Sequence, residues 1–307
     1  MSAAGSLLKR YEGNPILRPE DMPFPCYAVF NAGATRFGDR FLLVLRVEDL
    51  RRRSDFCVAT SEDGFRFEVR PEPIVYPLRE VEKRYGSHRF DMRITQMDGV
   101  YYCYHAMWIG PLHCTIGLAT TTDFVHFEPW PGCSVPSNRN AVLFPEKIGG
   151  NYARLERPEL PGGGSRIWYS ESPDLTYWGN SRPLDMPHLA WGHMKTGAGA
   201  IPIRTDEGWL EIYHGVGVTC SSNNYYLGAM LLDLEEPWKI VAAPESYILA
   251  AEKDYECMGQ TPNVVFTSGA VETEDGKLYV YYGCADHRMA LAIGEVDELV
   301  EFCLTAK

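Results

Sequence analysis

The segment FGDRFLLVLR (residues 37–46) decides the fold, because four other segments of the chain repeat its pattern. In each copy a glycine-containing turn is followed by alternating aromatic and β-branched residues. Glycine supplies the positive φ angle of a tight turn, and the period of two is typical of a β-strand. The other copies are DGVYYCYHAM (98–107), GGNYARLER (149–157), EGWLEIYHGV (207–216) and DGKLYVYYGCAD (275–286).

Each copy is followed by a second segment with a strand-like pattern. These segments are FCVATSEDGFRFEV (56–69), TIGLATTTDFVHFEPW (115–130), RIWYSESPDLTYWG (166–179), YLGAMLLDLEEPWKI (226–240) and MALAIGEVDELVEF (289–302). The first three contain Ser or Thr, then Asp, then an aromatic residue. We expect this Asp to close a tight turn through its side chain. Helical periodicity is weak and confined to 79–85 and 252–257.

The five copies have the spacing of a repeat protein. Their turn glycines are at positions 38, 99, 150, 208 and 276. Five repeats that each supply about four strands predict an all-β, five-bladed β-propeller that forms a single domain over residues 1–307. A β-sandwich is the rival fold, but it does not explain five paired copies. The inner strands of a propeller converge on a central funnel, where we expect the active site.

Composition narrows the class of protein. The chain has 307 residues, of which 45% are hydrophobic and 23% charged, which argues against disorder. We expect a cytoplasmic protein, because no run reaches the roughly 18 apolar residues of a membrane span and the start lacks a signal-peptide core. The net charge of −12 argues against nucleic-acid binding. Nine scattered cysteines without a CxxC pair predict free thiols rather than disulfides or a zinc site.

Asp91 is the candidate catalytic acid. It lies between Phe90 and Met92, where partial desolvation is expected to raise its pKa and suit it to proton donation. Arg93 would point the same way along a regular strand and oppose that shift. The structural interpretation of the same residues is an Asp91–Arg93 pair that fixes the entrance of a blade.

A set of cations stands out in this acidic chain, namely Arg139, Arg154, Arg157, Lys195 and His214. Guanidinium and ammonium groups together could hold a phosphate. On a regular strand Arg154 and Arg157 would face opposite sides. Lys195 precedes the glycine-rich TGAGAIP, whose small residues would let backbone approach a ligand. Taken singly, each of these residues is better explained structurally, as a surface cation or a core histidine.

Polar residues at strand ends are candidates for binding a sugar. Asn31, Arg46 and Asp286 lie at such ends, and the ring of Tyr225 could stack on a sugar face. Each of the three polar residues could instead be a cap or a turn residue. The chain has no HExxH, GxSxG, P-loop or dinucleotide fingerprint, so no metal or cofactor is expected, and hydrolase and nucleotide chemistry of those types is disfavoured.

The chain resembles glycoside hydrolase family 130, the β-mannoside phosphorylases, over nearly its whole length. The segments that carry the resemblance, in order, are NPILRPED (14–21), VFNAGA (29–34), LRVED (45–49), FDMRIT (90–95), NAVLFPEKIGGNYARLERP (140–158), KTGAGAIPI (195–203), GWLEIYHGV (208–216), YLGAMLLDLEEP (226–237) and PNVVFTSGAV (262–271). The resemblance implies a five-bladed propeller whose catalytic Asp is Asp91. It also implies phosphate binding by Arg139, Arg157, Lys195 and His214, with Arg154 adjacent, and sugar contacts from Asn31, Arg46, Tyr225 and Asp286.

Two motifs depart from the family pattern. The family's usual Asp-Pro-Arg is Asp91-Met92-Arg93 here, and its commoner NPGA is NAGA at residues 31–34. Without the proline, the residue before it is freed from a bias toward extended backbone. Neither change removes a functional side chain, but both leave the linkage specificity open.

The resemblance implies an inverting phosphorylase that converts a β-mannoside and inorganic phosphate to α-mannose 1-phosphate. The substrate would be β-1,4-mannosyl-glucose or a β-1,4-manno-oligosaccharide, with a β-1,2-mannoside as the second candidate. A β-mannosidase using water would need a second carboxylate, such as Asp286 or Glu48. Two rival hypotheses are an arabinanase-type glycosidase with three channel carboxylates and a non-catalytic sugar-binding propeller. We expect loops 76–89, 108–114 and 180–194 to set the acceptor, and homo-oligomers are compatible with such loops.

Overall fold

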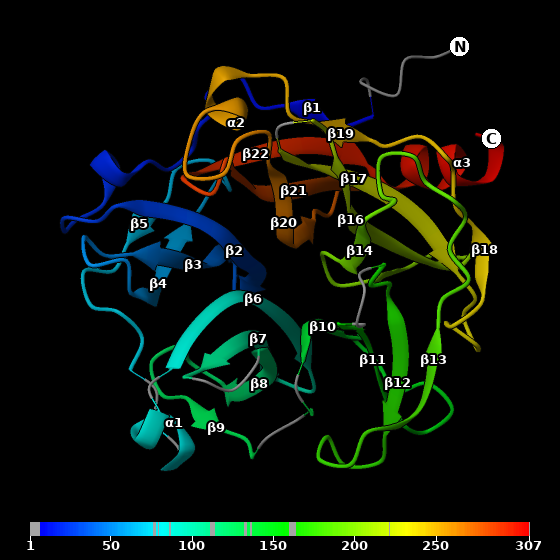
Figure 1. Cartoon of the computed structure of the whole chain (residues 1–307), viewed down its shortest axis with the longest axis horizontal. Coiled ribbons are helices and arrows are strands. Elements are labelled where there is room, and N and C mark those ends of the chain that lie inside the picture. Colours follow the sequence, from blue (N-terminus) through cyan, green and yellow to red (C-terminus); the bar gives the residue numbers. More distant parts are fainter. Residues whose placement is uncertain are drawn as a thin grey trace.

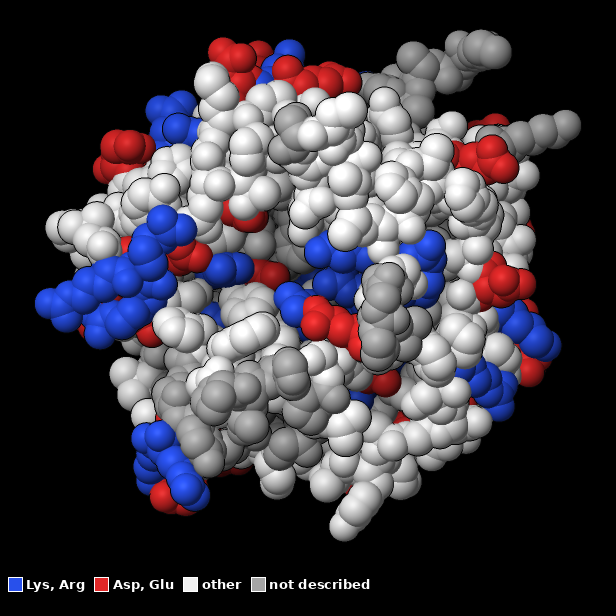
Figure 2. Space-filling view, in the orientation of Figure 1, with Lys and Arg blue, Asp and Glu red and all other residues white. Residues whose placement is uncertain are grey.

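The computed structural model describes residues 7–75, 78, 80–85, 87–110, 114–131, 134–135, 137–159, 164–220 and 222–306. Five antiparallel sheets stand around a common centre, as Figure 1 shows. The predicted five-bladed β-propeller is therefore confirmed. The face seen in Figure 2 is hollowed at its centre, and acidic and basic atoms lie around the hollow. Within the described residues, no helix has the length and apolar character needed to span a membrane.

The first three blades each contain four strands in sequence order, with the first strand innermost. Blade I comprises β2 (Ala28–Phe37), β3 (Arg40–Glu48), β4 (Ser54–Ser61) and β5 (Glu68–Val69). Blade II comprises β6 (Ser87–Met97), β7 (Val100–Ile109), β8 (Cys114–Thr121) and β9 (Glu128–Pro129). Blade III comprises β10 (Asn138–Leu143), β11 (Tyr152–Pro158), β12 (Trp168–Ser172) and β13 (Gly179–Pro183).

Blades IV and V vary this plan. Blade IV comprises β14 (Lys195–Ala198), β16 (Trp209–Val218), β17 (Asn223–Leu232) and β18 (Ile240–Ala242), with β15 (Ile203–Arg204) paired to β16 and β19 (Leu249–Ala250) paired to β17. Blade V comprises β20 (Val265–Glu272), β21 (Lys277–Cys284), β22 (Arg288–Glu295) and β1 (Lys9–Arg10). Its outer strand therefore comes from the other end of the chain.

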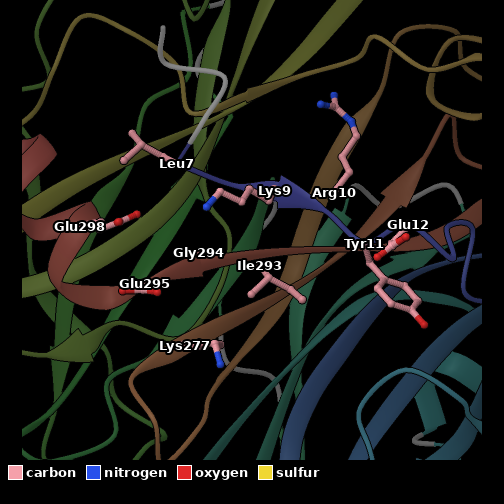
Figure 3. Close-up of a pocket in the computed structure, with 10 residues that line it drawn as sticks. All are labelled: Leu7, Lys9, Arg10, Tyr11, Glu12, Lys277, Ile293, Gly294, Glu295 and Glu298. Carbon is pink, nitrogen blue, oxygen red and sulfur yellow. The ribbon is translucent and has the colours of Figure 1, made fainter. Parts of the chain in front are cut away.

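The β1 strand closes the ring through both backbone and side-chain bonds. Lys9 and Arg10 pair with Ile293 and Ala292 of β22. In Figure 3 the Arg10 side chain points away from Lys9, and its Nε donates to Oε1 of the buried Glu256 at 2.8 Å. The cavity of about 280 Å³ beside β1 lies at the outer edge of blade V and contains none of the candidate site residues.

Apolar side chains fill the spaces between neighbouring blades. Five buried clusters are found in the described part of the chain, and each joins two adjacent blades. For example, Val44 of blade I and Cys103 of blade II share one cluster. Both faces of a blade are thus covered, which explains why the run FLLVL (41–45) is continuously apolar rather than alternating.

The turn predictions are confirmed. The five turn glycines all have positive φ, from 58° at Gly38 to 147° at Gly208. Asp63 Oδ1 accepts hydrogen bonds from the backbone N–H groups of Phe65 and Arg66 at 2.8 and 2.9 Å. Asp123 and Asp174 close the equivalent turns of blades II and III in the same way.

Four short helical segments occur in the described part of the chain. They are the 3₁₀ segment η2 (Pro19–Asp21) and the α-helices α1 (Glu80–Tyr85), α2 (Asp254–Cys257) and α3 (Val296–Thr305). The two weak helical stretches correspond to α1 and α2, but the strand predicted to run through 289–302 was wrong beyond residue 295. In α3 the buried residues Val296, Leu299, Val300 and Cys303 follow the spacing of a helix that packs one face on the core.

Candidate active site

The inner strands share an irregularity that aims polar side chains toward the centre. The pairing of β2, β6 and β10 with their neighbours shifts register between Phe30 and Gly33, between Phe90 and Arg93, and between Arg139 and Val142. Asn31, Asp91 and Asn140 occupy these bulges with φ of 48°, 56° and 56°. Asp and Asn tolerate this left-handed conformation better than most residues. Three inner strands therefore use the same kind of bulge to present a short polar side chain.

Asp91 is buried and held by two donors. Its Oδ1 accepts from Asn31 Nδ2 at 2.9 Å and from Arg46 Nη1 at 3.1 Å. Arg93 does not bond to the Asp91 carboxylate, and its Nη1 instead donates to the backbone carbonyl of Asp91 at 2.9 Å. The register shift between Phe90 and Arg93 explains why the side-by-side geometry of a regular strand does not hold here.

A chain of alternating charges runs from Asp91 toward the surface. Arg46 Nη2 donates to Glu48 Oε1 at 2.9 Å, and Arg52 Nε donates to Glu48 Oε2 at 3.2 Å. Burial raises the pKa of Asp286, and the nearby carboxylates of Asp91 and Glu48 add to that rise against Arg46. We call Asn31, Arg46, Glu48, Asp91 and Asp286 the carboxylate half of the site. It is contributed by blades I, II and V.

A second group of residues comes from blades III and IV. Arg139 and Arg157 are paired across β10 and β11, and Lys195 and His214 lie on the adjacent strands β14 and β16. We call Arg139, Arg157, Lys195 and His214 the cation half. Arg139 Nη2 contacts the carboxylate of Glu159. The structure therefore brings together the four residues for which phosphate binding was predicted.

His214 is the fully buried member of the cation half. Its Nε2 is 3.0 Å from Arg157 Nη1 and 3.3 Å from Asn140 Nδ2. Because both neighbours are donors, Nε2 acts as the acceptor and the ring proton belongs on Nδ1. A Cβ on Gly197 would lie 2.6 Å from Asn140 Nδ2 and 2.6 Å from His214 Cε1, so the glycine makes room for this pair.

Burial and charge repulsion lower the pKa values of three members of the cation half. Burial, reinforced by Arg157 and Arg139, lowers the pKa of Lys195 to about 8. Burial and the neighbouring Arg139 lower the pKa of Arg157 to about 10. Burial and the three cations Arg157, Arg93 and Lys195 hold the pKa of His214 well below its ordinary value, so its ring is neutral near pH 7. An anion bound here would relieve this mutual repulsion.

Tyr225 lies between the two halves. Its ring stacks on His214 with centroids 6.3 Å apart, and Lys195 Nζ is 5.6 Å from its centroid. Burial raises the pKa of Tyr225, and the carboxylates of Asp286 and Asp91 add to the rise against Arg157 and Arg139. One aromatic side chain is therefore in electrostatic reach of both halves.

Arg154 lies apart from the cation half. It faces away from Arg157, as the alternation along β11 predicted. Its Nη2 is 2.6 Å from Glu156 Oε2, and its guanidinium lies 3.9 Å from the centroid of the Trp178 ring. These side chains line a separate pocket of about 480 Å³.

Sequence reasoning missed Asn140 and Glu159. The signal for Asn140 was its position on an inner strand, which matches that of Asn31 and Asp91. Residues 76–77, 79, 86 and 111–113, in two of the loops expected to set the acceptor, lie outside the described residues. No group of three or more His, Cys, Asp or Glu side chains suited to a metal ion occurs in the described ranges.

Comparison with a family model and with known enzymes relates the chain to one family. The model of glycoside hydrolase family 130, described as beta-1,4-mannooligosaccharide phosphorylase, matches residues 8–305. The beta-1,4-mannooligosaccharide phosphorylase of Ruminococcus albus is 35% identical, covering 95% of this chain and 90% of that protein. The 4-O-beta-D-mannosyl-D-glucose phosphorylase of Bacteroides fragilis is 32% identical, covering 90% of this chain and 75% of that protein.

Similarity to a solved structure points the same way. A complex of the beta-1,2-mannobiose phosphorylase of Listeria innocua with beta-1,2-mannobiose superposes with a TM-score of 0.87. That match has 29% identity and covers 97% of this chain and 99% of the other. The chain is therefore an enzyme of glycoside hydrolase family 130, the family of the β-mannoside phosphorylases.

Proposed function

We propose that the enzyme cleaves β-1,4-linked mannosides by inverting phosphorolysis, giving α-mannose 1-phosphate and a shortened acceptor. The observation that carries this proposal is the cation half. Arg139, Arg157 and Lys195 lie close together, so that burial and neighbouring cations lower the pKa values of Arg157 and Lys195. Among the described residues they have one carboxylate contact, that of Arg139 with Glu159. Such a cluster is costly unless an anion occupies it.

In the proposed reaction, phosphate is the nucleophile. Arg139, Arg157 and Lys195 hold it, while His214 fixes Arg157 by accepting its Nη1–H group. A phosphate oxygen forms a bond to the anomeric carbon as the glycosidic C–O bond breaks. Because phosphate arrives already ionised, no second carboxylate is needed as a base. Charge compensation and positioning then supply most of the acceleration.

Asp91 supplies the proton to the departing oxygen. The family resemblance implies that the proton passes through the 3-hydroxyl of the mannosyl unit, so Asp91 need not touch the glycosidic oxygen. Asn31 and Arg46 hold its Oδ1 and also face the bound mannosyl unit in this proposal. Tyr225 and Asp286 complete the sugar site, and Arg154 contributes from the neighbouring pocket.

The preference for β-1,4 linkages rests on relatives. The family description and the Ruminococcus albus relative both concern β-1,4-mannooligosaccharides, and the Bacteroides fragilis relative acts on mannosyl-glucose. The structural neighbour from Listeria innocua supports β-1,2-mannosides as the second candidate.

Hydrolysis is the competing reaction. It requires a carboxylate base opposite the acid, and Glu48 is already engaged by Arg46 and Arg52. Asp286 lies in the same half as Asp91 rather than across the site. The geometry therefore supports phosphate rather than water as the nucleophile.

The test is to incubate the enzyme with β-1,4-mannosyl-glucose, β-1,4-mannobiose and β-1,2-mannobiose, each with and without inorganic phosphate. Phosphorus and proton NMR would follow the products. We expect α-mannose 1-phosphate to form only with phosphate and fastest from a β-1,4 substrate. Release of free mannose at the same rate with and without phosphate would overturn the proposal. Faster turnover of β-1,2-mannobiose would overturn the proposed preference for β-1,4 linkages.

A further inference from the structure

Arg93 is a buried arginine whose guanidinium donates to three backbone carbonyls. Its side chain is 1% exposed. Nη1 donates to Asp91 O at 2.9 Å, Nη2 to Ala198 O at 3.1 Å and Nε to Gly199 O at 3.2 Å. All three guanidinium nitrogens are thus used, and they join the bulge of blade II to the end of β14 in blade IV.

The other bulges provide an internal comparison. The residue that follows the bulge is Gly33 in β2, Val142 in β10 and Gly269 in β20. These small or apolar residues show that a propeller bulge does not require an arginine. Burying a guanidinium costs free energy that an apolar side chain avoids. The exception occurs in the strand that carries the acid, which indicates a role tied to Asp91.

The backbone segment of blade IV that Arg93 contacts is also held in place. Gly199 N donates to Oε1 of the fully buried Glu211 at 3.0 Å. A Cβ on Gly199 would lie 2.3 Å from the backbone oxygen of Ile212, so this turn of chain packs directly on β16. Burial lowers the pKa of Arg93 to about 10, while Asp91 and Glu211 oppose that fall. Arg93 therefore remains a cation near neutral pH.

We propose that Arg93 is a positioning residue that fixes the backbone of Asp91 and sets the spacing between the acid and β14, the strand that begins with Lys195. Asp91 has a φ of 56°, a conformation that persists only where neighbouring contacts enforce it. Arg93 supplies such a contact and ties it to the strand of the cation half. This inference rests on the proposed phosphorolysis.

The test compares two leaving groups. A mannoside of 4-nitrophenol releases a stable phenolate and needs little help from a proton donor, whereas a β-1,4-mannoside needs full protonation. For Arg93→Met we expect kcat on β-1,4-mannobiose to fall ~100-fold or more, the scale of general-acid catalysis. On the aryl mannoside the fall should be at least ten times smaller, and the KM for phosphate should change little.

Arg10→Met is the matched control, because Arg10, like Arg93, donates to a backbone carbonyl of a distant segment, but it does so together with the Glu256 carboxylate at the outer edge of blade V. It should lower thermal stability and leave both kcat values unchanged. If Arg93→Met does not fold, Arg93→Lys keeps the charge but loses the three-nitrogen fork, and the same split between substrates is expected. Equal losses on both substrates, or no loss, would overturn the inference. If the wild-type enzyme shows no phosphate-dependent turnover, the proposed function fails instead.

Discussion

The carboxylate half and the cation half are built from the same kind of inner hairpin, yet they treat charge in opposite ways. In the carboxylate half opposite charges alternate from Asp91 through Arg46 to Glu48, and Arg52 extends this chain. In the cation half like charges gather, and burial together with these neighbours lowers the pKa values of Arg157 and Lys195. The first half is organised by its own ion pairs, whereas in the proposed function the second is completed by the bound phosphate.

The largest effect should come from the carboxylate half. Asp91→Asn is expected to lower phosphorolysis and the reverse synthesis ~10³-fold or more, because the amide cannot donate the catalytic proton. The free energy of unfolding should change by no more than about 1 kcal/mol, since Asn tolerates the left-handed backbone and still accepts a hydrogen bond. Coupled kinetics and thermal denaturation measure the two quantities.

Asp123→Asn is the matched control for that variant, because Asp123 closes an exposed turn in the same blade. It should cost some stability and leave kcat unchanged. Near-normal turnover by Asp91→Asn would show that the acid lies elsewhere.

The cation half should respond through phosphate. Lys195→Ala is expected to raise the KM for phosphate ~10- to 100-fold, the scale of one charge-assisted hydrogen bond. The KM for the mannoside should change less than threefold or so, because Lys195 belongs to the other half. Steady-state kinetics with each substrate varied in turn would separate the two. A larger change in the mannoside KM would contradict the assignment of phosphate binding to the cation half and of mannoside binding to the carboxylate half.

The smallest effect concerns pH. Lys195, with its pKa lowered to about 8, is charged below that pH and neutral above it. The kcat/KM for phosphate should therefore fall as the pH rises through about 8, because this parameter reports the free enzyme. Lys195→Arg keeps its charge and should shift the decline to higher pH. An unchanged profile in that variant would assign the titration to another group.

The sequence predicted the blades better than the site. The repeated hairpins follow from turn glycines and alternation, which are local properties, so all five were found. The bulges of the inner strands depend on how these strands crowd together at the centre. For that reason the pairing of Asp91 with Arg46, rather than with Arg93, was not predicted.

The alternation along β11 did predict that Arg154 faces away from Arg157. One further miss concerns the segment after β22. Helix α3 was missed because Val296 follows β22 without an intervening turn, and its packing on the core through one face decides between strand and helix. Local pattern specifies the elements, and tertiary packing chooses among them.

The closure of blade V has a consequence for how the protein is made. Lys9 and Arg10 are translated before blades I to IV, and their β-sheet partners Ile293 and Ala292 are translated after those blades. Blades I to IV can pair their strands as they emerge, but β1 has no partner until β22 has been made. The pairing of β1 with β22 and the contact between Arg10 and Glu256 must therefore form after blades I to IV have been translated.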